Sequence, residues 1–132
     1  MTRKHTILLA LVLVTILPGT LAAEELVREF RGERSTETAE FEAEAPWLID
    51  WRVNSDYSES MGFDVELVNA PRGDHAGRVV KTKRRDSGLR LINESGRFRF
   101  KVESALAYWT IKVIQLTPDE AKQYTPKEKG IL

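Results

Sequence analysis

The sequence contains no cysteine among its 132 residues. This excludes disulfide bonds, zinc–thiolate sites, thiol catalysis and lipid attachment at a cleavage-site cysteine. A domain without disulfides has to rely on its own hydrophobic core, and a chain of this length is large enough to form one. Basic and acidic residues number 20 each, so the formal net charge is zero and no nucleic-acid partner is expected.

Long apolar runs are also scarce, and the one that exists lies at the N-terminus. Arg3 and Lys4 precede twelve uncharged residues, TILLALVLVTIL, which are followed by PGT and the small residues LAA. This is the layout of a secretory signal peptide, and the run is shorter than the roughly 20 residues of a membrane span. We predict a signal peptide over residues 1–23, cleaved after Ala23 or Ala22, with an uncleaved anchor as the alternative. The mature protein is then expected in the periplasm or the medium, without a membrane segment.

The remainder of the chain alternates between apolar and polar residues with a period of two, which is typical of strands with one buried face. The clearest runs are TAEFEAE, WLIDWRV, FDVELV, GRFRFKVES and AYWTIKVIQL, and the weaker ones are LVREF, GRVVKTK and GLRLI. Turn-forming residues separate these runs, and no helical pattern of ten or more residues follows the signal segment. Residues 24–116 are therefore predicted to form an all-β domain, an antiparallel, jelly-roll-like β-sandwich of about eight strands.

The polar sides of these runs carry an ordered charge pattern. Residues 40–42 and 64–66 place acids outward, whereas residues 97–101 place bases outward. Opposite charges on neighbouring strands stabilise their pairing, so the basic run is expected beside the acidic ones. At the C-terminal end, Thr117, Pro118 and Glu120 form a capping-box pattern, and Pro126 limits the helix to one or two turns. Residues 117–132 are thus predicted to be a polar tail with at most a short helix.

Few residues are suited to catalysis or to metal binding. His75 is the only histidine after the signal segment, and no Gly-x-Ser-x-Gly, Ser-x-x-Lys or His-Glu-x-x-His motif accompanies it. Asp56, Glu59 and Asp86 have the oxygen ligands that calcium prefers, but not the spacing of an EF-hand. We therefore predict no enzyme activity, no cofactor and no metal, while a triad assembled around His75 from distant residues stays open.

The stretch WLIDWRV reads as a strand that places Trp47, Ile49, Trp51 and Val53 on one face. A sugar-binding platform presents aromatic rings on an otherwise polar face, so the apolar neighbours indicate that both rings belong to the core. If one ring reaches the rim, we expect it to be Trp47, which begins its strand beside Pro46. Trp47 is retained as a candidate binding residue on this ground.

Taken together, ETAEFEAEAPWLIDWRVN, MGFDVELVNA, SGRFRFKVES and YWTIKV resemble a class of small exported bacterial β-sandwich modules. The layout is also similar to that of the pre-peptidase C-terminal domains of secreted enzymes. The resemblance covers nearly the whole mature chain and implies a jelly-roll-like, non-catalytic module. Because its motifs consist of core residues, it implies no site residues.

The sequence thus predicts an exported, non-catalytic binding or accessory protein that acts through its loops or surface. The expected partner is an envelope or extracellular protein or polysaccharide; the oligomeric state is left open. Loops 54–61, 84–88 and 104–107 are expected at one end of the sandwich, and loops 44–46, 70–77 and 93–96 at the other. The first end carries the candidate binding residues Tyr57, Arg84, Arg85 and Asp86, because tyrosine and arginine are common interface anchors. The alternatives are an envelope carbohydrate-binding module and an inhibitor of a secreted hydrolase, which would use a rigid loop at 70–77.

Overall fold

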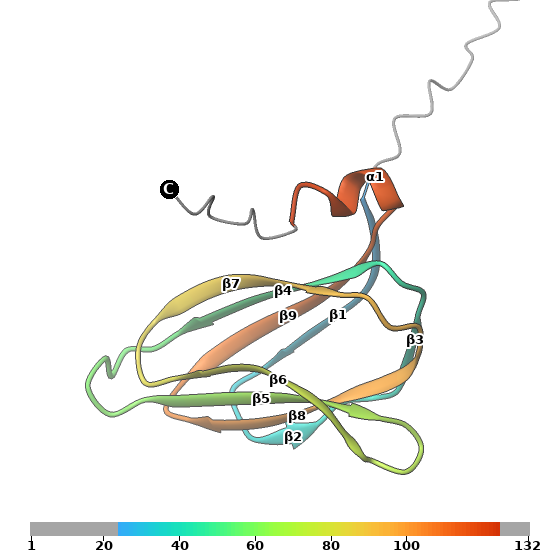
Figure 1. Ribbon diagram of the computed structural model, residues 1–132. Coiled ribbons are helices and arrows are strands. Elements are labelled where there is room, and N and C mark those ends of the chain that lie inside the picture. The colour runs from blue at the N-terminus through green and yellow to red at the C-terminus, as the bar shows by residue number, and fades with distance from the viewer. Residues whose placement is uncertain (1–23, 125–132) are drawn as a thin grey trace, which may run out of the picture.

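A computed structural model of the protein describes residues 24–124, which form two β-sheets packed face to face (Figure 1). Nine strands and one short helix occur within these residues. They are β1 (Glu25–Gly32), β2 (Thr36–Glu37), β3 (Phe41–Ala43), β4 (Trp47–Asn54), β5 (Gly62–Asn69), β6 (His75–Thr82), β7 (Asp86–Ile92), β8 (Gly96–Ala105), β9 (Tyr108–Gln115) and α1 (Pro118–Ala121). The predicted signal peptide and the end of the tail lie outside the described residues.

The strand order is that of a jelly roll. One sheet has the order β1-β9-β4-β7, and the other has the order β2-β8-β5-β6, with β3 also paired to β8. All pairs are antiparallel. Apart from β2–β3 and the β5–β6 hairpin, every connection crosses from one sheet to the other, as two interleaved Greek keys require. The predicted antiparallel, jelly-roll-like sandwich is confirmed.

Of the run at residues 38–44, only Phe41–Ala43 form a strand, β3, and the short strand β2 precedes the run. β2 and β3 both pair with β8, but Thr38 to Glu40 between them belong to no strand. The Thr38 hydroxyl accepts a hydrogen bond from the Phe100 amide at 2.9 Å and so takes the place of a backbone acceptor. This interruption ends the alternation, which is why Ala39 is exposed and not buried beside Phe41.

Both tryptophans of WLIDW lie in the core, as predicted: 0% of Trp47 and 8% of Trp51 is exposed. The Trp47 ring contacts those of Phe41 and Phe98, with centroids 5.6 and 5.3 Å away. Its Nε1 donates a hydrogen bond of 2.9 Å to the carbonyl of Glu94. The expectation that Trp47 is the residue nearest the rim is wrong, because the loop between β7 and β8 covers the start of β4 and receives the indole N–H.

Two core tryptophans occupy space that glycines on the edge strands leave free. A Cβ on Gly88 of β7 would lie 2.6 Å from the Trp51 ring, and one on Gly32 of β1 would lie 2.7 Å from the Trp109 ring. β7 and β1 are the two edges of the same sheet. Each indole therefore covers the adjacent edge strand, an aromatic–glycine pairing that fixes the position of that strand.

The short helix α1 begins with the predicted capping box. The Thr117 side chain accepts from the Glu120 amide at 3.2 Å, and the Glu120 carboxylate accepts from the Thr117 amide at 2.9 Å. Ala121 packs with Leu48 and Leu116 in a small cluster on the outer side of the four-stranded sheet. None of the helices among the described residues has the length and hydrophobicity needed to cross a membrane.

Candidate functional site

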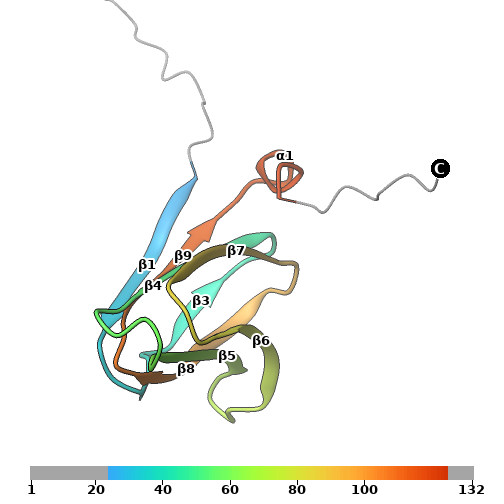
Figure 2. The same cartoon turned by 90° about the vertical axis from the view of Figure 1, so that its left-hand side faces the viewer.

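Three loops that carry the predicted binding residues meet at one end of the sandwich. The connections β4–β5, β6–β7 and β8–β9 all lie at the left of Figure 1, and this end faces the reader in Figure 2. The connections β3–β4, β5–β6 and β7–β8 lie at the opposite end (Figure 1). The loops are therefore grouped as expected, because successive antiparallel strands return the chain to the same two ends. We call the first of these the recognition end, defined by residues 55–61, 83–87 and 106–108.

A buried serine joins two loops of the recognition end. The Ser55 hydroxyl donates to the carbonyl of Leu106 and accepts from the amide of Tyr57 at 2.9 Å. Leu106 has a φ of 52°, a left-handed conformation that is unusual for a bulky residue. Although Ser55 is buried, the Tyr57 and Leu106 side chains are 60% and 55% exposed. One hydroxyl therefore anchors the backbone of two apolar side chains that face solvent.

A hollow of about 580 Å³ opens beside these loops, on the outer face of the four-stranded sheet. Arg85 and Asp86 line it, as does Tyr108, which is 42% exposed. The remaining polar lining comes from β4, β7 and β9 and consists of Arg52, Asn54, Ser87 and Thr110. Tyr57 and Arg84 are exposed but do not line the hollow, and Trp47 is buried at the other end of β4. Of the five candidate residues, only Arg85 and Asp86 therefore line the hollow.

A second hollow of about 590 Å³ continues along the same face. It shares Arg52 and Ser87 with the first hollow and extends past Asp50 and Leu89 to Tyr124. We call the two together the β4 groove, because the outward side chains of β4 form its floor from Asn54 to Leu48. Sequence reasoning missed the groove, since it requires knowing that β4 lies between β7 and β9.

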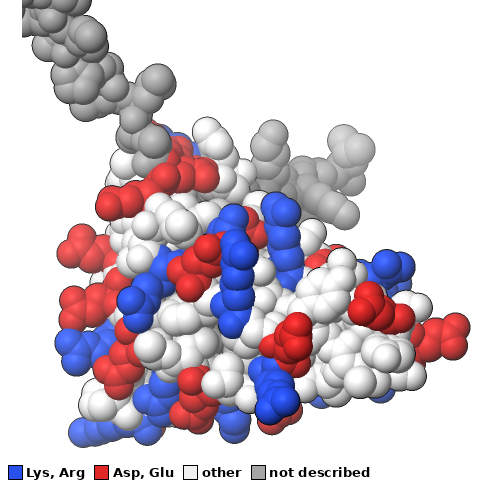
Figure 3. All heavy atoms as spheres, turned by 180° about the vertical axis from the view of Figure 1, so that it is seen from behind, with Lys and Arg blue, Asp and Glu red and all other residues white. Residues whose placement is uncertain are grey.

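The outer face of the five-stranded sheet pairs its arginines with acids of neighbouring segments. Arg97 lies 2.8 Å from Glu42, Arg99 lies 3.4 Å from Glu37, and Arg78 lies 3.5 Å from Asp64. β8 runs between β3 and β5, so the expected placement of the basic run beside the acidic runs is confirmed. Acidic and basic side chains are interspersed on the side of the molecule in Figure 3, and neither sign forms a continuous field there.

The charged side chains of the β4 groove differ from these arginines in having no ion-pair partner among the described residues. Asp50, Arg52 and Arg85 make no hydrogen bond or ion pair with any other side chain within residues 24–124. Asn54 uses its Oδ1 to accept from the Ser55 amide at 2.9 Å, which leaves its NH₂ group free. Polar side chains on the outer face of β4 are therefore available to a ligand, whereas the arginines of the opposite face are committed to structure.

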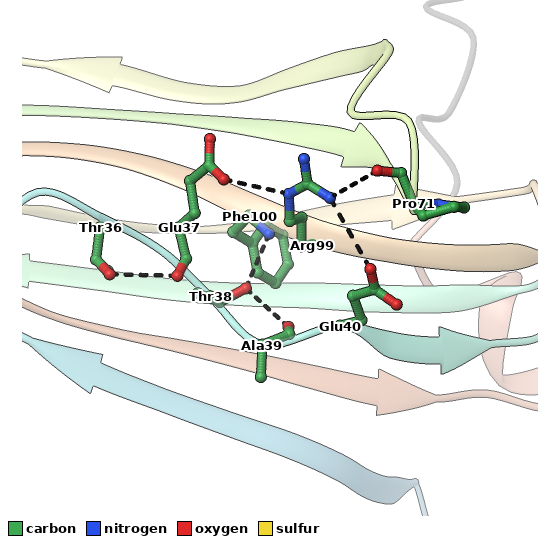
Figure 4. A network of polar contacts seen from close by, with 8 residues as sticks. All are labelled: Thr36, Glu37, Thr38, Ala39, Glu40, Pro71, Arg99 and Phe100. Carbon is green, nitrogen blue, oxygen red and sulfur yellow. Dashed lines mark hydrogen bonds and ion pairs between the residues drawn. The ribbon is translucent and has the colours of Figure 1, made fainter.

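Arg99 braces the loop between β5 and β6 (Figure 4). Its guanidinium donates to the carbonyl of Pro71 at 3.3 Å and lies 4.0 Å from a carboxylate oxygen of Glu40. A Cβ on Gly73, whose φ is 83°, would lie 2.6 Å from the same guanidinium. Backbone bonds from Asn69 to Asp74 and from Ala70 to Arg97 close the loop at 2.8 and 3.0 Å. The loop is therefore held in one conformation.

Another hollow, of about 690 Å³, lies on the five-stranded sheet above Gly62 and Ala105, which face each other across β5 and β8. Lys81, Lys83 and Glu103 form its walls. It contains no exposed aromatic ring, and its Asp64 is paired with Arg78. We therefore place the candidate site in the β4 groove and not in this hollow.

His75 lies at the start of β6, where its Nδ1 is 3.8 Å from a carboxylate oxygen of Glu66. Its side chain is exposed, and within the described residues it makes no hydrogen bond to a serine hydroxyl. The same part of the chain holds no group of three histidine or acidic residues that would bind a metal ion.

The far end of the groove is closed by a contact between the two ends of the described chain. The Tyr124 hydroxyl donates a hydrogen bond to a carboxylate oxygen of Glu24. This hydrogen bond is the main cause that raises the pKa of Tyr124 to about 12, and partial burial adds to it.

No protein-family model matches the chain, and no curated protein matches it either. The resemblance to pre-peptidase C-terminal domains stays a prediction.

Proposed function

We propose that the protein is an exported, non-catalytic binding module whose ligand is held at the recognition end and in the adjoining β4 groove. The observation that carries this proposal is the contrast between the arginines of the two outer faces, since lysines of the five-stranded sheet such as Lys81 and Lys101 also make no ion pair within the described residues. Arginines of the five-stranded sheet are paired with acids, whereas Asp50, Arg52 and Arg85 around the groove have no partner in the described chain. A ligand that covers these charges removes their water, and the hydrogen bonds that it makes to them have to offset that cost.

The exposed apolar groups support the same location. Tyr57, Leu106 and Tyr108 are half exposed and lie on the loops that frame the groove. Aromatic and arginine side chains at the centre of a contact supply most of its binding energy. Because Ser55 fixes the loop backbone, little conformational entropy is lost when the ligand binds.

The proposal is tested by affinity capture from the envelope and culture medium of the producing cell. The protein obtained from expression of the full chain is immobilised as wild type, as a Tyr57→Ala/Arg85→Ala variant, and as an Arg72→Ala/Asp74→Ala control at the opposite end. We expect the first variant to lose the captured material and the control to retain it. Equal capture by both variants would place the function elsewhere.

The inhibitor function is a second candidate, favoured by the braced loop between β5 and β6. A protease inhibitor needs a loop held in one conformation, and Arg99 and the bonds across the loop supply this. If Arg72 in this loop contacts a hydrolase, Arg72→Ala abolishes capture of that enzyme while Tyr57→Ala does not. Loss of capture in Tyr57→Ala but not in Arg72→Ala supports the first proposal.

A further inference from the structure

The β4 groove has the dimensions of a site for a linear chain. β4 rises by about 3.4 Å per residue, so the floor from Leu48 to Asn54 is about 20 Å long. Tyr108 stands at one end of the groove and Tyr124 at the other. The two hollows adjoin, because Arg52 and Ser87 line both of them. An extended polymer therefore fits this surface better than a compact ligand.

The backbone of the floor is not available for binding. β4 is paired with β7 from Trp47 to Val53 and with β9 from Trp47 to Asn54. A peptide that binds by strand addition requires a free sheet edge, which β1 and β7 offer in this sheet and β4 does not. A ligand on the floor of the groove is therefore recognised through the side chains of β4.

The side chains of the groove favour a ligand rich in hydroxyl groups. Arg52 and the NH₂ group of Asn54 are free donors, Asp50 is a free acceptor, and Ser87 and Thr110 beside Arg52 supply both. The groove is lined by two arginines, Arg52 and Arg85, and by three acids, Glu24, Asp50 and Asp86, so it has no excess of positive charge. A nucleic acid is disfavoured for this reason, since binding of its phosphates requires a basic surface.

Tyr108 completes the site with an aromatic ring. It lies directly opposite Asn54 across β4 and β9, and 42% of it is exposed. Tyrosine combines an apolar face with a polar hydroxyl, which matches a pyranose ring with its apolar face and hydroxyl rim. We propose that the β4 groove binds a linear, uncharged polysaccharide, with Tyr108 stacking on one sugar ring and Asp50, Arg52 and Asn54 bonding to hydroxyl groups. This inference rests on the proposed function and names the ligand class of the same site.

The test uses the protein from expression of the full chain and isothermal titration with four neutral tetrasaccharides: cello-, xylo-, chito- and maltotetraose. We expect at least one to bind. We expect Tyr108→Ala and Arg52→Ala each to weaken that binding about tenfold or more, since each removes a contact equivalent to a charged hydrogen bond or a stacked ring. Tyr108→Phe keeps the ring and retains most of the affinity. Lys101→Ala is the control, because this exposed cation lies on β8 of the opposite sheet, and it leaves saccharide affinity unchanged.

The outcomes separate the inference from the proposed function. If no tetrasaccharide binds, while affinity capture still depends on Tyr57 and Arg85, the ligand is a protein and the polysaccharide inference is wrong. If a saccharide binds but Tyr108→Ala and Arg52→Ala leave its affinity unchanged, the groove is not the site. If capture is independent of both the loops and the groove, the proposed function itself fails. Melting curves of all variants confirm that each one is folded.

Discussion

Replacing Ser55 by alanine tests how the recognition end is built. The hydroxyl accepts from the Tyr57 amide at 2.9 Å and donates to the Leu106 carbonyl, so Ser55→Ala leaves two backbone groups without their partner. An unsatisfied buried polar group costs about 1–3 kcal/mol. Because water reaches part of this loop after truncation, we expect a total loss near the middle of that range, about 2 kcal/mol.

For a domain of about 100 residues, a loss of this size lowers Tm by about 10 °C. The measurement is thermal and urea unfolding followed by circular dichroism, with Ser58→Ala as the matched control. Ser58 lies in the same loop, is exposed and makes no side-chain hydrogen bond in the described structure. We also expect Ser55→Ala to weaken ligand capture, because Tyr57 and Leu106 lose their common anchor. A Tm equal to that of Ser58→Ala would refute the role of this hydroxyl.

Two further predictions concern the core and the Tyr124 contact. Gly88→Ala should destabilise the fold by about 1–3 kcal/mol, because its Cβ would lie 2.6 Å from the Trp51 ring; Gly62→Ala, whose Cβ meets nothing closer than 4.0 Å, should be near neutral in the same unfolding assay. In an absorbance titration, one tyrosine should ionise near pH 12 and this step should vanish in Tyr124→Phe, because the bond to Glu24 raises the pKa of Tyr124 to about 12. Since the folded pKa lies above the usual value, the stability from this contact is complete below pH 10 and is lost as the pH rises through 12. A titration in which all tyrosines ionise together would contradict this reasoning.

The strands and their buried faces were predictable because the apolar alternation of a sandwich is local information. FDVELV and YWTIKV form β5 and β9 with the expected residues inward. In the run TAEFEAE, Phe41 and Ala43 are buried as predicted, but Ala39 is not, because the Thr38 side chain bonds to the backbone of Phe100, 62 positions away in the sequence. Alternation alone does not reveal a side chain that replaces a backbone partner.

The site was less predictable than the fold, and for a physical reason. Arg85 and Asp86 were recognised from their loop composition, but Arg52, Ser87 and Thr110 line the same hollow through strand register. Register depends on pairing between distant segments and cannot be read from one strand. Two residues did carry a local signal: Ser55 is a small polar residue directly after an apolar strand, and Tyr108 falls on the polar side of its run.

Trp47 was named from the sequence as a candidate binding residue, but the structure buries it. Its position beside Pro46 suggested a ring at the rim, but the carbonyl of Glu94 receives its indole N–H at 2.9 Å. Glu94 lies two residues after Ile92, which faces Trp47 across β4 and β7, so the partner is brought to Trp47 by the pairing of these two strands. The rings relevant to binding are therefore the exposed tyrosines and not the tryptophans.

Hydrogen–deuterium exchange of the protein, with and without the envelope or medium fraction that it captures, tests the central claim most directly. If ligand is held at the recognition end and in the β4 groove, the loop amides of residues 55–61, 83–87 and 106–107 become protected while the loop at 70–74 and the segment 36–42 exchange as before, since the amides of β4 and β9 are already paired in the sheet. Protection confined to residues 70–74 or 36–42 would contradict the claim and place binding on the braced loop or on the face whose charges are already paired.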